Sequence, residues 1–383
     1  MGEEIRFEDI ISEVVNKENN HDTILDDPDY PICREGYIKE IYTHLTPLFH
    51  LQKDSSGALI KGITGTGKTI TLKYIIKELT TYCKKKGINF KPIFWQGCAR
   101  SYTSSYALYK DILSYHGVEC NNNFHFSNFI KFFKTGGGIS LLILDELQEL
   151  RPEVMNGVIR DLTRVNEMDD MQNTTLSGKS VFSYILASNF FDASRFTQNT
   201  KSSIGNAKII IFEKYTKEQL LTILKEKTRM KQYTYKEDVA QEVVNHTHHT
   251  GDARVTLQRY GEIINLDNIT PQAIKRYILE KEQIELRNQI QGLSNIVKIT
   301  FKYCVYLSQE TESFTSETIF QVNKIEANNK IQEQFSLSSI SNAVSYLESI
   351  GLVTTGHRQT RGRSRNIFIT PEQLEIYKKV VDG

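Results

Sequence analysis

The chain has 383 residues, of which 39% are hydrophobic and 24% charged, and its 47 Lys and Arg nearly balance its 46 Asp and Glu. This length predicts two or three domains, because a single hydrophobic core stops growing at about 250–300 residues. The ordinary globular composition excludes a collagen-like rod and a wholly disordered chain. A net charge of +1 restricts any nucleic-acid surface to a local basic patch.

The start of the chain and its cysteines indicate an intracellular protein. The opening MGEEIRFEDI is acidic and lacks the apolar segment of a signal peptide. The five cysteines are scattered and form no C-x-x-C pair, which argues against a zinc finger and a disulfide scaffold. The longest apolar runs have the length of a strand, so no membrane span is expected. We therefore expect a soluble cytoplasmic protein that associates with the nucleoid.

Short apolar strands alternate with helical patterns up to about residue 215. The first strand leads through glycines into a helix whose apolar residues recur at i, i+3, i+4 and i+7 from Leu72. Strands separated by helices predict a parallel sheet covered on both faces. The strand candidates are residues 58–61, 90–96, 139–144, 181–187 and 208–212.

A glycine-rich phosphate loop follows the first predicted strand. Residues 62–69 read GITGTGKT, which fits G-x-x-x-x-G-K-[ST] between a strand and a helix. Glycines let backbone N–H groups curl around phosphates, and the helix N-terminus adds partial positive charge. Lys68 is expected to reach the β- and γ-phosphates, and the Thr69 hydroxyl to bind Mg²⁺. The candidate nucleotide contacts of this loop are Gly62, Thr64, Gly65, Thr66, Gly67, Lys68, Thr69 and Ile70.

Two acids end the third predicted strand. The run LLILDE brings Asp145 and Glu146 directly after four apolar residues. A buried strand would deliver Asp145 to the magnesium at the C-terminal edge of the sheet. Glu146 would then be placed to polarise an attacking water. Such a run is weak evidence alone, but together with the phosphate loop it predicts an ATPase site.

Helices replace strands after residue 215. Three helical stretches fill 216–266, and a charged helix from Pro271 to near Gly292 is typical of a linker between domains. Beyond it the order is helix, helix, helix, strand, basic loop, strand, which is that of a winged helix. These last elements are expected at about 295–309, 316–331, 337–350, 351–353 and 367–369.

The two motifs resemble those of AAA+ ATPases, and further landmarks narrow the likeness. Asn189 ends the fourth predicted strand as a sensor 1 residue does, and Gly251-Asp252-Ala253-Arg254 resembles the sensor 2 G-D-A-R of archaeal replication initiators. That family is related to the large subunit of the eukaryotic origin recognition complex and to its helicase-loading partner. The resemblance implies that Asn189 orients the attacking water and that Arg254 reaches the γ-phosphate from a helical lid. It also places Tyr30 and Pro31 on the adenine side of the nucleotide.

The sequence departs from this family at two places. Asn199 stands where the family carries an arginine two residues before Lys201, and that arginine usually acts on a neighbouring subunit's nucleotide. This argues against hydrolysis activated across an interface, since Arg195 lies four residues away from the expected position. Gln148 stands where the family often has an aspartate. The chain therefore resembles a divergent member, and slow, switch-type hydrolysis of ATP to ADP and phosphate is expected.

Basic charge in the C-terminal segment gathers in one loop. Residues 356–366 read GHRQTRGRSRN, with four arginines and no acid, which suits a wing that contacts DNA phosphates or a minor groove. A solvated basic loop is the alternative. The preceding helix offers only short polar side chains opposite its apolar face, which favours shape and backbone contact over base readout. The candidate DNA contacts are Arg358, Arg361, Arg363, Arg365, Ser338, Ser339 and Asn342.

The expected fold is an α/β AAA+ core with a five-stranded parallel sheet and helices on both faces, an all-α lid and a C-terminal winged-helix domain. The family's second DNA contact, a helical insertion, matches residues 115–129, where no contacting residue can be assigned. The expected divisions are a tail at 1–24, the core at 25–215, the lid and linker helix at 216–293 and the winged helix at 294–383.

The expected function is ATP-dependent replication initiation. ATP or ADP with Mg²⁺ would be the cofactors, and double-stranded origin DNA and the replicative helicase the partners of a protein that is monomeric in solution or assembles on DNA. A transcriptional regulator of the same architecture is one alternative, which Asn199 and Gln148 favour. A helper of transposition or plasmid maintenance is another.

Overall fold

The computed structural model describes residues 30–50, 57–96, 101–120, 126–165, 180–189, 196–204, 207–230, 234–264, 269–329, 333–357 and 365–381. They form two compact units, one ending at Tyr260 and one beginning at Gly261. None of the described helices is both long and apolar enough to cross a membrane.

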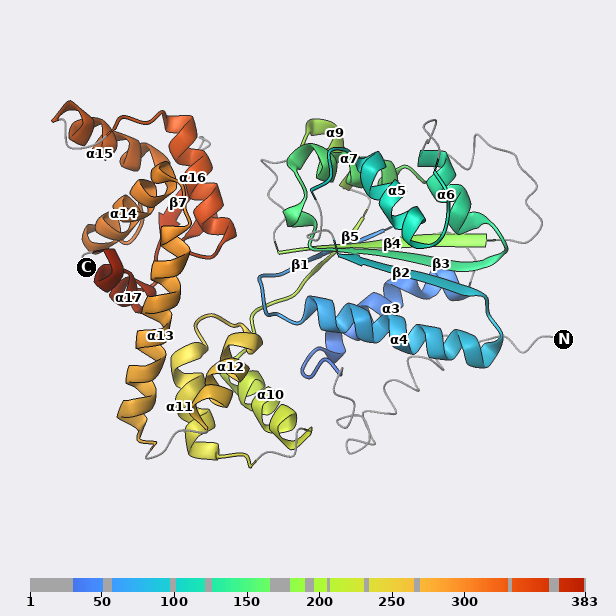
Figure 1. Ribbon diagram of the computed structural model, residues 1–383, viewed down its shortest axis with the longest axis horizontal. Helices are drawn as coiled ribbons and strands as arrows, with labels where there is room; N and C mark the ends of the chain where they lie inside the picture. The colour runs from blue at the N-terminus through green and yellow to red at the C-terminus, as the bar shows by residue number, and fades with distance from the viewer. Residues whose placement is uncertain are drawn as a thin grey trace. The chain divides into compact units, whose positions relative to one another are not determined.

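The first unit is built on a five-stranded parallel sheet with the strand order β2-β3-β4-β1-β5 (Figure 1). The central strands β3 and β4 are buried along almost their whole length, because their apolar runs are covered on both faces. The predicted parallel sheet is confirmed. Its strands are β1 (Ala58–Lys61), β2 (Phe90–Gln96), β3 (Gly138–Asp145), β4 (Ser180–Ser188) and β5 (Lys208–Ile211).

Helices cover both faces of this sheet (Figure 1). Helices α3 (Glu35–His50) and α4 (Lys68–Lys86) lie on one face. The other face carries α5 (Ser105–Tyr115), α6 (Phe126–Lys134), α7 (Pro152–Thr163) and α9 (Gln198–Ile204). Apolar residues of α5, α6 and α7 pack with β3 and β4 into one continuous core. This packing holds the sheet rigid beneath the loops at its carboxyl edge.

Three helices follow the sheet, as the sequence predicts, and the last turn of the third belongs to the second unit. They are α10 (Lys217–Met230), α11 (Glu237–Thr247) and α12 (Ala253–Ile263). A turn through Gly251, whose φ is +63°, connects α11 to α12. This turn contacts the segment that follows β5, because the Tyr215 N–H donates to the Gly251 carbonyl at 3.5 Å.

The second unit has the winged-helix order that the sequence predicts, with one added helix at its end. One apolar core joins its helices to the hairpin of β6 and β7. Phe314 forms an isolated antiparallel bridge to Ile367 of β7. The unit contains α13 (Pro271–Gln291), α14 (Asn295–Glu310), α15 (Ser316–Asn328), α16 (Leu337–Ser349), β6 (Thr354–His357), β7 (Arg365–Phe368) and α17 (Pro371–Val381).

The first strand of the hairpin begins later than predicted. The expected strand at 351–353 is instead the turn that closes α16, where Gly351 has φ +79° and the Leu352 N–H donates to the Leu347 carbonyl at 2.9 Å. Leu352 and Val353 are buried in the core, which explains their apolar character without a strand. Helix α17, which the sequence analysis did not predict, packs on α13 and α14.

Candidate nucleotide site

Three neighbouring strand ends bring the predicted residues of the first unit together. The phosphate loop leaves β1, Asn189 follows β4 beside it, and Asp145 ends β3 on the far side of β4. Because the strands are parallel, all three carboxyl ends meet at one edge of the sheet, where ligands of such folds bind. The topology therefore assembles one site from residues 62–69, 145–146 and 189.

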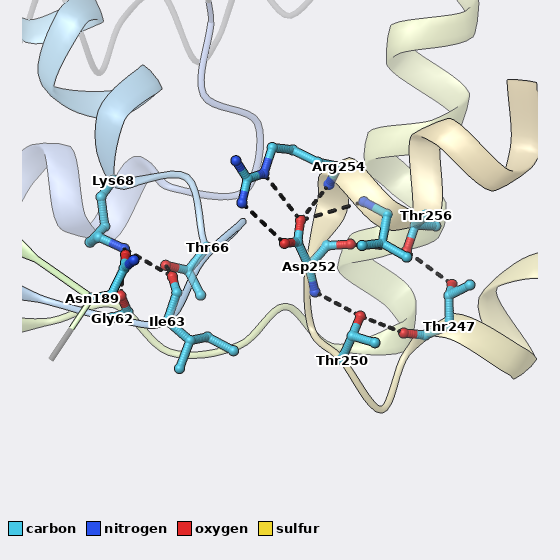
Figure 2. Close-up of polar contacts among 11 residues, drawn as sticks. Gly62, Ile63, Thr66, Lys68, Asn189, Thr247, Thr250, Asp252, Arg254 and Thr256 are labelled. Atoms are coloured by element: carbon cyan, nitrogen blue, oxygen red, sulfur yellow. Dashed lines mark hydrogen bonds and ion pairs between the residues drawn. The ribbon is translucent and has the colours of Figure 1, made fainter. Parts of the chain in front are cut away.

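Lys68 is the centre of this assembly. It begins α4 and is only 6% exposed. Its Nζ donates to the Gly62 carbonyl, to the Ile63 carbonyl at 2.9 Å and to Asn189 Oδ1 at 2.9 Å (Figure 2). Burial lowers the pKa of Lys68 to about 8, and the nearby charge of Asp145 opposes this shift. A buried ammonium group thus lies at the mouth of the phosphate loop.

Thr69 and Asp145 place two oxygen atoms side by side. Thr69 Oγ1 donates to Asp145 Oδ2 at 2.6 Å, and the Glu146 N–H donates to Asp145 Oδ1 at 2.9 Å. Burial raises the pKa of the Asp145 carboxyl, and these two bonds oppose the rise. Hydroxyl and carboxylate oxygens are the ligands that Mg²⁺ takes in nucleotide sites, so this pair fits the metal.

Glu146 has an unusual backbone. Among the described residues, Glu146 and Cys33 are the non-glycine residues with positive φ, at 59° and 60°. The left-handed conformation turns the chain from β3 into a short 3₁₀ turn, η2 (Leu147–Glu149). Such conformations are costly and cluster at functional sites, where the surrounding structure enforces them. Here the left-handed residue comes directly after Asp145, the last residue of β3, and begins the turn of η2.

The backbone of the phosphate loop fits an anion. Gly65 and Gly67 have φ of +71° and +86°, and a β-carbon on either would overlap a neighbouring side chain, Asp252 or Tyr215. The N–H groups of Gly65, Gly67 and Lys68 donate to no acceptor within the described part of the chain. Unpaired N–H groups at a helix N-terminus are the donors that bind phosphate.

The other loop candidates differ in exposure. Thr66 is fully buried, and its Oγ1 donates to the Ile63 carbonyl at 2.8 Å, so its side chain shapes the loop itself. Thr64 is exposed at the loop tip, and Ile70 is half-buried on α4. The side chain of Thr66 is thus engaged within the protein, whereas that of Thr64 faces solvent.

The adenine-side candidates are both buried. The Tyr30 ring packs edge-on against Tyr74 of α4, with ring centroids 5.3 Å apart, and its hydroxyl donates to Glu35 Oε1 at 3.2 Å. Pro31 is buried, and its carbonyl accepts the Arg34 N–H at 3.1 Å. These residues fix the segment before α3 against the helix that follows the phosphate loop.

Arg34 supports the phosphate loop from behind, a role that the sequence analysis did not foresee. Its guanidinium, in a residue only 2% exposed, donates to the Thr66 carbonyl at 2.8 Å and to the Glu213 carbonyl at 2.9 Å. It also lies 3.5 Å from the centroid of the Tyr215 ring. Arg34 therefore joins the first helix, the phosphate loop and the segment that leads into α10.

The lid side of the site is formed by the start of α12. The Asp252 carboxylate caps this helix by accepting the Arg254 N–H at 2.8 Å, and the Asp252 N–H donates to Thr250 Oγ1 at 3.1 Å. The Ala253 N–H donates to the Gly65 carbonyl at 3.3 Å, which fastens α12 to the phosphate loop. The Arg254 side chain is 71% exposed, pairs with Asp252 at 3.3 Å and extends toward the group around Lys68 (Figure 2).

The DNA-contact candidates lie in the second unit. Ser336 caps α16 and its hydroxyl bonds those of Ser338 at 3.1 Å and Ser339 at 2.9 Å, so both serines take part in the helix cap. Asn342 is exposed one turn further on. Arg358, Arg361 and Arg363 lie outside the described residues. Arg365 begins β7, and its side chain is likewise outside the described part.

Comparison with known proteins also indicates an AAA+ nucleotide-binding protein. Residues 52–186 match the family described as an AAA domain. The ORC1-type DNA replication protein of Desulfurococcus amylolyticus is 25% identical, over 97% of this chain and 98% of that protein. The ORC1-type DNA replication protein 1 of Sulfolobus acidocaldarius is 24% identical, over 91% of this chain and 89% of that protein.

Solved structures share the fold over both units. The Aeropyrum pernix ORC1 protein, solved in complex with DNA, has a TM-score of 0.55 at 21% identity and covers 92% of this chain and 93% of its own. The Aeropyrum pernix ORC2 protein, solved as ADPNP-ADP complexes, has a TM-score of 0.57 at 14% identity and covers 94% and 97%. With its AAA+ sheet, helical lid and winged helix, the chain is similar over almost its whole length to the ORC1-type proteins, and these matches support an archaeal replication initiator of the AAA+ class.

Proposed function

We propose that this protein is an ATP-dependent initiator that binds double-stranded origin DNA and recruits or loads the replicative helicase. The observation that carries the proposal is the convergence of Lys68, Asn189 and Asp145 at adjacent strand ends, with Arg254 extending toward the same loop. In this proposal the core (25–215) and lid (216–293) read the nucleotide, and the winged helix (294–383) binds DNA on the nucleoid.

The nucleotide half of the proposal assigns a task to each side chain. Lys68 and the loop N–H groups would bind phosphate oxygens, and Thr69 with Asp145 would hold Mg²⁺. When bound, the metal neutralises phosphate charge. Glu146 would accept a proton from the attacking water, which Asn189 orients. Arg254 would contact the γ-phosphate, so that the lid reports which nucleotide is present.

The DNA half of the proposal rests on the hairpin between β6 and β7 and on α16. Residues 356–366 carry four arginines and no acid, and α16 presents Asn342 on its exposed side. Arginines on a hairpin tip would neutralise phosphates, while a polar helix face would follow the shape of the duplex. Binding would therefore depend strongly on salt and weakly on any single base.

The experiment that tests the DNA half is a salt titration of the full chain on duplex DNA. Replacing Arg361 and Arg363 by Ala should reduce the slope of log K against log salt by about 0.9 for each lost phosphate contact. Lys84→Ala, an exposed change in α4, serves as the control. If the double variant binds with the wild-type affinity and slope, the wing does not contact DNA and the initiator proposal loses its DNA site.

A second candidate function is a transcriptional regulator that keeps the same architecture. The supporting observation is α9, where Asn199 is exposed and Lys201 is the one basic residue of the helix. Without an arginine there, ATPase activity per protein should be nearly independent of protein concentration. Mapping of bound genomic sites separates the candidates, since an initiator would occupy one or two origins and a regulator many promoters.

A further inference from the structure

Gln148 connects the turn after β3 to the end of β4. It lies in η2, whose first residue, Leu147, is buried in the core and fixes the turn. The half-buried Gln148 side chain crosses to the neighbouring strand, where its Oε1 accepts the Asn189 N–H at 2.9 Å and the Ser188 hydroxyl at 3.1 Å. One acceptor atom thus binds both the last residue of β4, Ser188, and the residue after it, Asn189.

The chemistry of the partners fixes the orientation of both amides. A backbone N–H can only donate, so the Gln148 atom that faces Asn189 is the carbonyl oxygen. Lys68 Nζ can likewise only donate, so the Asn189 atom that faces it is Oδ1. Asn189 is therefore held at its backbone by Gln148 and at its side-chain oxygen by Lys68. Its Nδ2 is the donating end of the amide.

At the end of β4, the sheet pairs Ser188 with β1 but no longer pairs it with β3. The ladder between β3 and β4 ends at the pair Leu144 and Leu186. On the β1 side, Lys61 still pairs with Ser188, and the Gly62 N–H donates to the Ser188 carbonyl at 3.3 Å. Past the end of the β3 ladder, Gln148 supplies the connection on the other side.

We propose that Gln148 is a positioning residue for ATP hydrolysis, which holds Asn189 in line with the loop that carries Glu146. This inference rests on the proposed ATPase function. Gln148 follows Glu146, the expected base, by two residues. Its hydrogen bonds therefore connect the turn that contains Glu146 to Asn189, the expected sensor residue. Loss of the bridge would free Asn189 to move while Lys68, Thr69 and Asp145 remain in place to bind nucleotide.

The test compares Gln148→Met, which keeps the length of the side chain without the accepting oxygen, with Gln148→Glu, which keeps an oxygen at that position. Gln241→Met, an exposed change of the same kind on α11, is the matched control. Each full-length variant is assayed for thermal stability, for binding of ADP and of a non-hydrolysable ATP analogue, and for single-turnover hydrolysis of ATP. Glu146→Gln defines the rate without the proposed base.

We expect Gln148→Met to keep its thermal stability and its ADP affinity, while hydrolysis and the preference for the ATP analogue over ADP each fall about tenfold. Gln148→Glu should restore both to within about threefold. Wild-type hydrolysis by Gln148→Met overturns the proposal, as does equal loss of ADP affinity and stability, which marks a structural role. If the wild type hydrolyses no faster than Glu146→Gln, the ATPase proposal fails, and the analogue-to-ADP ratio still decides whether Gln148 positions Asn189.

Discussion

The two sides of the nucleotide site are built in different ways. On the sheet side, Lys68 and Asp145 are buried, and each is bonded to a residue from another element, Asn189 or Thr69. On the lid side, Arg254 is exposed and pairs with Asp252, two residues away on the same turn. A group held by two elements moves only if the sheet end is disrupted, whereas an exposed pair exchanges partners at little cost. The sheet side is thus suited to binding and the lid side to sensing nucleotide state.

The largest effect should come from the sheet side, at Glu146. Replacing Glu146 by Gln keeps the size of the side chain and removes the base, so hydrolysis should fall by about 10²–10⁴-fold with ATP affinity unchanged. Single-turnover assays and equilibrium binding measure the two quantities. Glu149→Gln, an exposed change three residues further on, should leave both unchanged. A wild-type rate in Glu146→Gln would assign the base to another residue.

Lys68 should show the next largest effect, on binding itself. Lys68→Ala is expected to remove a charged phosphate contact worth about 1.5–3 kcal/mol, which corresponds to a tenfold to hundredfold loss of affinity for ATP and ADP alike. Calorimetry measures both affinities, with Lys84→Ala as the exposed control on the same helix. Unchanged affinity in Lys68→Ala would remove the phosphate-loop assignment.

Arg254 tests the lid side of the comparison. Arg254→Ala should weaken binding of a non-hydrolysable ATP analogue about tenfold, the low end for a charged contact because the side chain is exposed. ADP affinity should stay the same, since ADP lacks the γ-phosphate. Arg229→Ala on α10 is the control within the lid. An equal loss of affinity for both nucleotides would mean that Arg254 contributes to binding in general, which would contradict the assignment of nucleotide sensing to the lid side.

The smallest effect concerns pH. Burial lowers the pKa of Lys68 to about 8, so the charged form that we propose binds phosphate is half lost at that pH in the nucleotide-free protein. Affinity should therefore be about twofold weaker at pH 8 than at pH 6.5 and should fall further above it. Nucleotide binding at pH 8 should take up protons, which calorimetry in buffers of different ionisation enthalpy detects. A flat profile to pH 9 would mean that Lys68 stays charged.

The motifs and the sheet could be predicted from the sequence because each depends on residues close together in the chain. The phosphate loop fits a pattern of eight residues, and the apolar runs of β3 and β4 mark buried parallel strands. The order of strands in the sheet did not have to be known, since parallel strands place Asp145 and Asn189 at the same edge.

The contacts that join distant segments could not be predicted in this way. Gln148 was visible as a departure from the family pattern, but its bond to Asn189 spans 41 residues and depends on how two strands end. The strand of the hairpin was placed three residues early, because Leu352 and Val353 look like strand residues while Gly351 turns the chain. An apolar pattern shows that a residue is buried and does not show which element buries it.

The contacts of Arg34 determine when the support of the phosphate loop can be completed during synthesis of the chain. Its guanidinium joins the Thr66 carbonyl, 32 residues away, to the Glu213 carbonyl, 179 residues away. On a ribosome that adds about 5–20 residues per second, Glu213 follows the phosphate loop by roughly seven to thirty seconds. Throughout that interval Arg34 can reach the Thr66 carbonyl but lacks its second acceptor, the Glu213 carbonyl. A growing chain therefore completes the Arg34 contacts behind its phosphate loop only after the last strand of the sheet has been synthesised.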